Sequence, residues 1–274
     1  MDDGLTGQTS KPKIVGIINV TPDSFSDGGQ VDSVEAAVAQ AAKFVKEGAA
    51  WVDVGGESTR PNAAPVSADV EVERIRPVVQ EIHRAFPNLP ISIDTSKPRV
   101  AQAAIEVGAS IVNDVTACAA PGMAELCRDS KSSVVLMHMR GTPQTMQKNT
   151  KYNDLCASVQ QYLIERARSI ERIGVEKNRI LLDPGLGFGK APVDNFALIR
   201  AIPALKQLGY PVFVGASRKR FIGDVTGEKE AGKRVFGSVG AALAMATFGA
   251  DFLRVHDVGA TQRALDVYWK AVIG

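Results

Sequence analysis

The chain has 274 residues, with 45% hydrophobic residues and 32 Lys and Arg against 30 Asp and Glu. This ordinary globular composition excludes a disordered, collagen-like or coiled-coil protein. The mixed charges show no basic stripe of the kind that nucleic-acid-binding proteins carry. The polar first twelve residues contain no apolar signal segment, and no run approaches the roughly 18 apolar residues of a membrane span. Three cysteines without a C-x-x-C pair argue against a disulfide framework, so we expect a cytoplasmic protein that binds neither nucleic acid nor membrane.

Short runs rich in Val, Ile or Leu alternate with longer amphipathic segments along the chain. Such runs are typical of parallel strands that are covered on both faces. They predict strands at residues 13–19, 50–54, 90–94, 110–113, 133–139, 179–183, 211–215 and 252–256.

The segments between these strands have helical periodicity. From Val34 to Val45, apolar residues recur at three- and four-residue steps, and Gly48 follows as a stop signal. Further helices are predicted at about residues 67–86, 97–107, 121–130, 152–173, 194–208, 231–249 and 258–271. Pro77 and Pro203 lie inside two of these segments, where we expect kinks or breaks.

Eight strand-then-helix units without a linker or a shift in composition predict a single α/β domain, a (β/α)8 TIM barrel. Barrels of this kind typically have about 250 residues. An open doubly wound sheet is the alternative, although eight parallel strands would be many for that fold. We expect residues 1–12 to form a flexible N-terminal tail and residues 13–274 to form the barrel.

Polar or glycine-rich groups follow each predicted strand at its C-terminal end, where barrel enzymes place their active sites. The starts of the strands carry no comparable pattern, so the asymmetry favours a functional site. The groups are Asn19, the loop 55–60, Asp94, Asn113 with Asp114, His138, Asp183, Ser217 with Lys219, and Arg254 with His256.

Several of these residues also have simpler explanations. Asp94 could cap the following helix, and Asp183 could belong to a turn. His138, which lies between two methionines, is expected to be a buried core histidine. The glycines at 185, 187 and 189 have the wrong spacing for a dinucleotide-binding loop.

The chemistry of the strand ends favours an anionic heterocycle as ligand. Three histidines without paired spacing exclude the familiar zinc sites, whereas Mg²⁺ held by Asn19 and phosphate oxygens is compatible. Lys219 and Arg254, after the last two strands, suit a phosphate group. We expect them to lie across the mouth from Asp94 and Asp183, whose carboxylates suit the N–H donors of a 2-amino-4-oxo pyrimidine.

A series of short motifs runs in order through most of the chain. The longest are GIINVTPDSFSDGG at 16–29 and GGESTRP at 55–61. The others are IDT at 93–95, VND at 112–114, LMHM at 136–139, LDPG at 182–185, GFGK at 187–190, GASRK at 215–219 and RVHD at 254–257. In this ordered set the sequence resembles the dihydropteroate synthases, the bacterial folate-synthesis enzymes that sulfonamides inhibit.

The resemblance implies a pterin-binding barrel that works as a homodimer. It implies a transferase that joins 6-hydroxymethyl-7,8-dihydropterin diphosphate to p-aminobenzoate and releases 7,8-dihydropteroate and pyrophosphate. The aryl amine is already nucleophilic, so no Ser-His-Asp triad is needed. The difficult step is the loss of diphosphate, which Mg²⁺ on Asn19 would assist.

The residue roles that the resemblance implies fall into four sets. Catalysis is assigned to Asp94, Lys219, Arg254 and His256. The pterin ring would be held by Asp94, Asn113, Asp183 and Lys219, in a pocket lined by Val115, Met137 and Phe188. The diphosphate would be bound by Arg60, Arg254 and His256. The p-aminobenzoate pocket would include Phe25, Thr59, Pro61 and Ser217, with Gly215 beside the substrate site.

Two other functions agree with parts of this pattern. A pterin-binding barrel that transfers a methyl group from methyltetrahydrofolate would share the ring-binding acids. It would need neither the loop at residues 21–29 nor the pair Arg254 and His256. A non-catalytic pterin-binding paralogue should have lost Asn19 or Arg60, and both are present.

Overall fold

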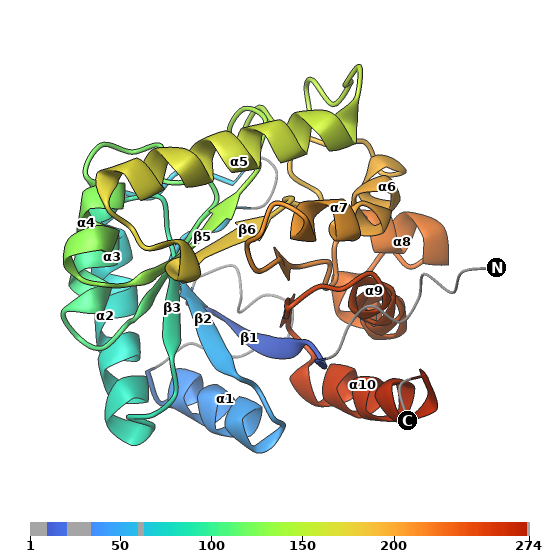
Figure 1. The fold of residues 1–274 in the computed structure, drawn as a ribbon. Helices are drawn as coiled ribbons and strands as arrows, with labels where there is room; N and C mark the ends of the chain where they lie inside the picture. The colour runs from blue at the N-terminus through green and yellow to red at the C-terminus, as the bar shows by residue number, and fades with distance from the viewer. Residues whose placement is uncertain (1–9, 21–33, 60–62, 273–274) are drawn as a thin grey trace.

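The computed structural model describes residues 10–20, 34–59 and 63–272. Within these ranges strands and helices alternate, and Figure 1 shows the strands at the centre with helices around them. The strands are β1 (Lys13–Asn19), β2 (Trp51–Gly55), β3 (Ile91–Asp94), β4 (Ile111–Asp114), β5 (Ser133–Met137), β6 (Ile180–Asp183), β7 (Phe213–Val214) and β8 (Phe252–Val255).

The helices form the outer layer of the molecule. They are α1 (Val34–Lys46), α2 (Ala68–Ala85), α3 (Pro98–Ile105), α4 (Met123–Asp129), α5 (Leu155–Ile173), α6 (Asp194–Arg200), α7 (Ile202–Lys206), α8 (Arg220–Thr226), α9 (Val235–Thr247) and α10 (Val258–Val272). Short 3₁₀ helices lie at Lys177–Arg179 and Ala231–Lys233. None of the described helices combines the length and the apolar composition that a membrane crossing requires.

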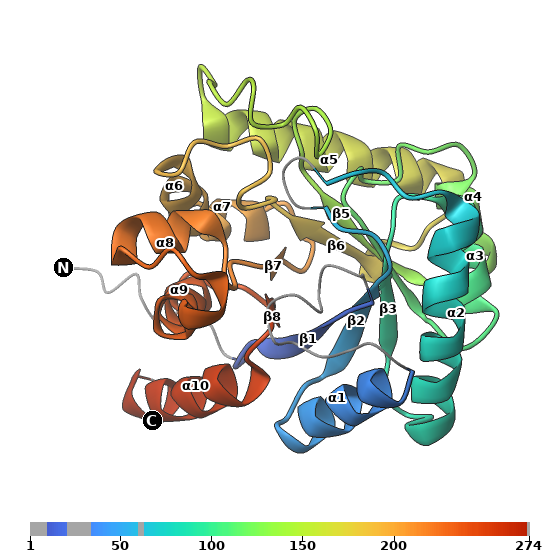
Figure 2. The ribbon, with the colours of Figure 1, turned by 180° about the vertical axis from the view of Figure 1, so that it is seen from behind.

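The strands form one parallel sheet in the order β6-β5-β4-β3-β2-β1-β8-β7. Figure 2 shows β7 and β8 beside β1 from the back of the molecule. A parallel bridge between Leu182 of β6 and Val212 closes the sheet, and the Leu182 N–H donates to the Pro211 carbonyl at 2.9 Å. The predicted (β/α)8 barrel is therefore confirmed, and the open sheet is wrong.

An apolar plug fills the N-terminal end of the barrel interior. It consists of Val15, Trp51, Ile111, Val135, Leu181 and Phe213, with Phe252 packed against them. The ring of Trp51 stacks on Phe213 with centroids 6.0 Å apart and lies 4.6 Å from Phe252. Because side chains alternate along a strand, Trp51 places Asp53 and Gly55 on the same inward face, closer to the strand ends.

The predicted break at Pro203 is confirmed, whereas the helices differ from the predictions at Pro77 and at α8. Pro203 lies in the first turn of α7, after a break at Ala201, as expected. Pro77 was expected to kink or break its helix; a break is wrong, because α2 continues through Pro77, with Ile75, Val78 and Val79 buried around it. The structure also adds α8, a short helix before the predicted 231–249 segment.

Candidate active site

The C-terminal ends of the strands bring the predicted residues to one mouth of the barrel. The strand register makes neighbours of the following pairs: Asn19 with Gly55, Gly55 with Asp94, Asp94 with Asn113, and Met137 with Asp183. Residues that are far apart in sequence therefore line one continuous arc.

At the centre of this mouth, Arg254 extends from β8 and forms two ion pairs. Its Nε donates to Oδ2 of Asp53 at 2.6 Å, and its Nη2 donates to Oδ2 of Asp94 at 2.8 Å. Asp53 also accepts from Asn113 Nδ2 at 3.1 Å and from Ser92 Oγ at 2.5 Å. The expected separation of basic and acidic groups is wrong for Arg254, because a cation this deep in the barrel needs anionic partners.

Asp94 has one carboxylate oxygen held by Arg254 and one that is available. Its Oδ1 is buried and has no hydrogen-bond partner among the described residues. The capping explanation for Asp94 is wrong, since Lys97 is the N-cap of α3 and no side chain caps that helix. Burial raises the pKa of Asp94 to about 7, against the opposing effect of Arg254. This oxygen is therefore an unsatisfied buried acceptor, a kind of group that a ligand N–H can satisfy.

Asp183 and Lys219 form the other side of the mouth. Asp183 Oδ1 accepts the Gly185 N–H at 2.7 Å, so the residue does support a turn as well as facing the site. Burial raises the pKa of Asp183, and the Lys219 cation opposes this effect. Lys219 donates to the Leu186 carbonyl at 2.5 Å and lies 4.8 Å from the ring centroid of Phe188. Burial lowers the pKa of Lys219 to about 8, with Asp183 opposing.

His138 and Lys190 support the loop after β6 from within. Lys190 Nζ lies 2.8 Å from His138 Nδ1, 2.9 Å from the His138 carbonyl, 2.8 Å from the Pro184 carbonyl and 2.9 Å from the Gly185 carbonyl. Burial lowers the pKa of His138 to about 3, and Lys190 adds to the effect, so the imidazole is a neutral acceptor. The prediction of a buried core histidine is confirmed. Lys190 is a structural residue that the sequence analysis did not single out.

The segments after β7 and β8 are fixed to each other by hydrogen bonds. Ser217 Oγ accepts the His256 N–H at 3.1 Å and lies 3.0 Å from Nδ1 of the same residue. Arg218 forms a bidentate ion pair with Asp257, in which Nε donates to Oδ2 at 3.0 Å and Nη2 donates to Oδ1 at 2.7 Å. A Cβ at Gly215 would lie 3.3 Å from the Arg254 Cβ, so the glycine leaves room for the arginine stem.

The remaining predicted residues divide by whether the structure describes them. Val115 and Met137 are buried, whereas Asn19, Thr59 and Phe188 are half-buried. The loop at 21–29 with Phe25, together with Arg60 and Pro61, lies outside the described residues, as does most of the predicted tail. Their roles stay predictions.

Asp53 is the main site residue that strand-end reasoning missed. It lies inside a predicted strand, and its partners Ser92, Asn113 and Arg254 are 39, 60 and 201 residues away. The available signal was its spacing: a carboxylate two residues before Gly55 in an otherwise apolar strand must share the inward face with it.

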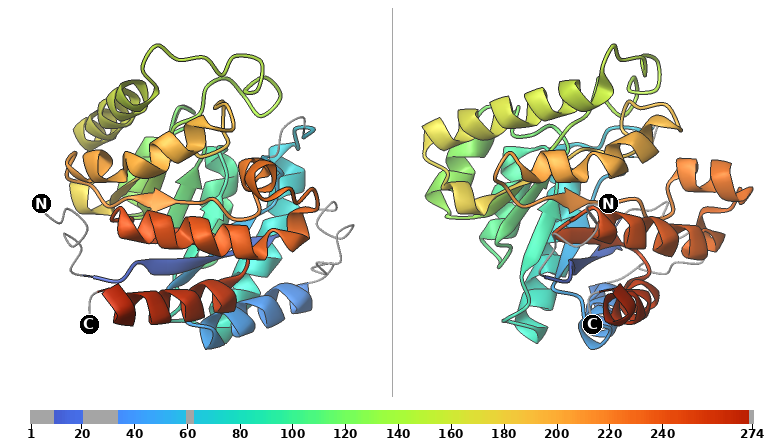
Figure 3. Two further views of the ribbon diagram at one scale, coloured as in Figure 1. Left: turned by 90° about the vertical axis from the view of Figure 1, so that its right-hand side faces the viewer. Right: turned by 45° about the vertical axis from the view of Figure 1, so that its right-hand side comes forward.

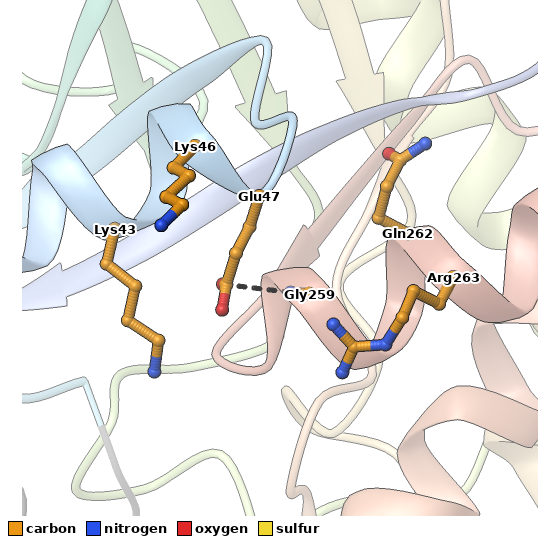
Figure 4. A pocket seen from close by; sticks show the side chains of 6 residues that line it. All are labelled: Lys43, Lys46, Glu47, Gly259, Gln262 and Arg263. Atoms are coloured by element: carbon orange, nitrogen blue, oxygen red, sulfur yellow. Dashed lines mark hydrogen bonds between the residues drawn. The ribbon is translucent and has the colours of Figure 1, made fainter.

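A hollow outside the barrel is lined by different residues, shown in Figure 4: Lys43, Lys46, Glu47, Gly259, Gln262 and Arg263. It lies between the end of α1 and the start of α10. Glu47 Oε2 accepts the Gly259 N–H at 3.0 Å, which stabilises the N-terminus of α10. Because the cations around it are exposed, we attribute this hollow to helix packing and place the site at the barrel mouth.

The barrel, with acids and cations gathered at its mouth, has counterparts among known proteins. The family described as "Pterin binding enzyme" matches residues 15–256, which defines the class of this protein. Dihydropteroate synthases of Escherichia coli (strain K12) and Neisseria meningitidis serogroup B are 44% and 46% identical to it, and each match covers 96% of this chain and 93% of the relative. The chain belongs to the dihydropteroate synthase family.

Solved structures agree with this assignment. Dihydropteroate synthase of Xanthomonas albilineans with 4-aminobenzoic acid superposes with a TM-score of 0.90 at 47% identity, covering 97% of this chain and 94% of that one. The enzyme of Thermus thermophilus in complex with 6HMPPP gives a TM-score of 0.83 at 36% identity, covering 96% and 95%.

Proposed function

We propose that this protein is a transferase that condenses 6-hydroxymethyl-7,8-dihydropterin diphosphate with p-aminobenzoate to form 7,8-dihydropteroate and pyrophosphate. The observation that carries this function is the acceptor set of Asp94, Asn113 and Asp183 facing a mouth that also contains Lys219 and Arg254. Relatives of known structure contain 4-aminobenzoic acid and 7,8-dihydropteroate.

The pterin ring is assigned to the acidic part of the mouth. The 2-amino-4-oxo edge of a pterin offers N–H donors, which suit the carboxylates of Asp94 and Asp183. Lys219 donates to ring acceptors from the opposite side. Apolar walls for the ring come from Val115, Met137 and Phe188.

The reaction breaks the bond between the methylene carbon and the diphosphate oxygen and forms a bond from that carbon to the aryl nitrogen. Pyrophosphate leaves with the electron pair of the broken bond, the nitrogen lone pair forms the new bond, and the nitrogen then loses a proton to water. The aryl amine is neutral at pH 7, so no strong base is required. The Asp94 carboxylate faces the positive charge that develops on the dihydropterin, a fixed charge of the kind that lowers such barriers.

The diphosphate is assigned to Arg254, His256 and Arg60. A guanidinium has five N–H donors, and Asp53 and Asp94 each take one of those of Arg254, so donors remain for phosphate oxygens. Ser217 orients the His256 ring through Nδ1.

Mg²⁺ fits the residues at the end of β1. Asn19 offers an amide oxygen, a ligand type that Mg²⁺ prefers, and this oxygen would lie 3.9 Å from a Cβ at Gly55, beside the mouth. The described residues contain no group of three His, Cys, Asp or Glu that could hold a metal, which suits an ion bound largely by substrate oxygens and water. When bound, Mg²⁺ neutralises charge on the leaving diphosphate.

The p-aminobenzoate pocket is assigned to the loops after β1 and β2. Thr59 and Ser217 are its described members, and Phe25 and Pro61 complete it by family resemblance. Gly215 lies beside Arg254 at the edge of the substrate site.

The protein is further proposed to be a cytoplasmic homodimer that associates through α9. This helix is almost entirely apolar, and its Phe236 is 91% exposed. Single exposed apolar side chains are normal on a protein surface, so the proposal rests on the homodimer that the family resemblance implies and assigns it to this apolar helix. In Figure 3, α9 and α10 lie side by side on the outside of the barrel.

We propose that residues 13–274 form one domain, the barrel, and that residues 1–12 form a tail in front of it. At the end of that tail, Lys11 pairs with Asp266 of α10, which connects the start of the barrel to its last helix.

The proposed function is tested by pyrophosphate release from purified protein. Release should require p-aminobenzoate and Mg²⁺ and should be inhibited by a sulfonamide. Methyl transfer from methyltetrahydrofolate to a corrinoid acceptor, without pyrophosphate release, would support the methyltransferase alternative instead.

A further inference from the structure

Asp53 lies inside the barrel, one layer below the strand ends. It is the third residue of β2 and is fully buried, with Trp51 below it and Gly55 above it on the inward face. A buried carboxylate is costly unless it is paired and hydrogen-bonded. The residues that pair with Asp53 therefore indicate which part of the site this carboxylate stabilises.

The three partners of Asp53 come from three other strands. Oδ1 accepts from Ser92 of β3, and Oδ2 accepts from both Asn113 of β4 and Arg254 of β8. One carboxylate thus ties β2, β3, β4 and β8 together directly beneath the groups assigned to the pterin ring.

The contact with Asn113 fixes the direction of its side-chain amide. An ionised carboxylate only accepts hydrogen bonds, so Asp53 holds the NH₂ end of Asn113. The carbonyl Oδ1 is then the part of the amide that remains to accept from a ligand. Without Asp53, Asn113 could turn and present a donor in place of an acceptor.

The contact with Arg254 has a similar effect on Asp94. With Nε on Asp53, the guanidinium is held so that its Nη2 reaches Oδ2 of Asp94. The second Asp94 oxygen, Oδ1, is the one without a partner among the described residues. Asp53 therefore helps to decide which oxygen of Asp94 is left without a partner and can accept from a ligand.

We propose that Asp53 is a positioning residue that fixes the acceptor pattern of Asn113 and Asp94 toward the N–H donors of a 2-amino-4-oxo heterocycle. The role rests on the proposed function of the mouth and adds to it a residue that touches no substrate. Asp53 acts entirely through Asn113 and Arg254.

The same arrangement predicts an effect of Asp53 on the titration of Asp94. The charged groups that face Asp94 come from β2, β4, β8, α2 and the segment after β7; they are Asp53, Asp114, Arg254, Glu71 and Lys219. Asp53 raises the pKa of Asp94, whereas Arg254 lowers it. Removing the Asp53 charge, and leaving Arg254 to Asp94 alone, lowers the pKa of Asp94.

The test is Asp53→Asn, which keeps the shape of the side chain and removes its charge. We expect KM for the pterin diphosphate to rise about tenfold, because the side chain keeps a single, uncharged acceptor oxygen that is no longer fixed toward Asn113 and Arg254. KM for p-aminobenzoate should stay within about twofold. The acid limb of kcat/KM for the pterin substrate should move to lower pH by about half a unit or more.

The matched control is Asp251→Asn, at the opposite end of the barrel. Asp251 accepts from Lys206 at 2.5 Å and from the Val212 N–H at 2.7 Å, so its loss also removes an ion pair and a backbone contact. Both KM values and the pH profile should be those of the wild type. If Asp53→Asn matches this control in pterin KM and acid limb, the positioning role is overturned.

Two further measurements cover the other outcomes. If Asp53→Asn does not fold, Ser92→Ala removes one hydrogen bond to Asp53 without changing charge, and it should raise pterin KM about two- to fivefold; no change overturns the proposal. Equilibrium binding of the pterin diphosphate, followed by fluorescence, compares wild type and variant without turnover. A wild type that binds the pterin but forms no dihydropteroate contradicts the proposed function alone, whereas equal binding by both contradicts the role of Asp53.

Discussion

Replacing Lys190 by methionine should destabilise the protein without removing a group that contacts substrate. Methionine fills much of the volume of the lysine stem but cannot donate hydrogen bonds. The change removes an amine with at most three N–H donors from the His138 imidazole and from the His138 and Pro184 carbonyls, whereas the Gly185 carbonyl still accepts the Phe188 N–H at 3.1 Å. A buried acceptor left unsatisfied costs about 1–3 kcal/mol. Even the lower end of this range gives about 3 kcal/mol for the three acceptors, and relief from burying an amine reduces the net loss to about 2 kcal/mol.

The measurement is urea unfolding followed by circular dichroism. Lys151→Met, an exposed lysine in the same region of the chain, is the matched control and should stay within about 0.5 kcal/mol of wild type. Lys190→Met should also raise KM for the pterin substrate, because the loop that it supports contains Asp183 and Phe188. A free energy of unfolding within about 1 kcal/mol of wild type would contradict this expectation, since the hydrogen bonds of Lys190 would then contribute nothing net.

Four other outcomes follow from the same structure. Asp94→Asn should lower kcat by about 10² to 10³ while the protein still melts as a folded domain, because one fixed charge at the reacting centre is lost; kcat within threefold of wild type would contradict the assigned role. The value of kcat/KM should fall below about pH 7, where Asp94 gains a proton, and above about pH 8, where Lys219 loses one. A kcat/KM that stays constant across both pH values would contradict this. Trp51→Ala should cost about 3–5 kcal/mol in urea unfolding with little change in either KM, as expected for a plug remote from the mouth. Phe236→Glu should convert the dimer to a monomer in light scattering, and an unchanged dimer would show that α9 is not the interface.

The order of elements was predictable because each strand is an apolar run bounded by helical periodicity. Sequence patterns failed to predict the elements whose extent depends on contacts between residues far apart in the chain. The predicted strand 211–215 shortens to Phe213–Val214, since Val212 makes only an isolated bridge to Leu182. Helix α8 is only seven residues long, too short to show a clear apolar repeat.

The candidate site was predictable as far as strand ends define it. Asp94, Asn113, Asp183 and Lys219 meet at one mouth because parallel strands end on the same side. Partner choice was not predictable, because nothing local to β8 indicates that Arg254 reaches Asp53, 201 residues away in sequence.

The loop after β6 shows the same limit. Three of the four acceptors around Lys190 are backbone carbonyls, whose position cannot be inferred from residue types, and the fourth is the His138 imidazole. Two of them belong to Pro184 and Gly185, whose sequence indicates only a turn. Only the folded chain brings them around one amine.

The acidic and basic groups of the mouth are proposed to join a pterin diphosphate to p-aminobenzoate. The most direct measurement is the product formed by purified protein from these two substrates with Mg²⁺, identified by mass spectrometry and compared between wild type and Asp94→Asn. We expect 7,8-dihydropteroate and pyrophosphate in equal amounts from the wild type, and a rate lower by a factor of about 10² or more from the variant. Absence of dihydropteroate from folded wild-type protein, or equal rates from both proteins, would contradict it.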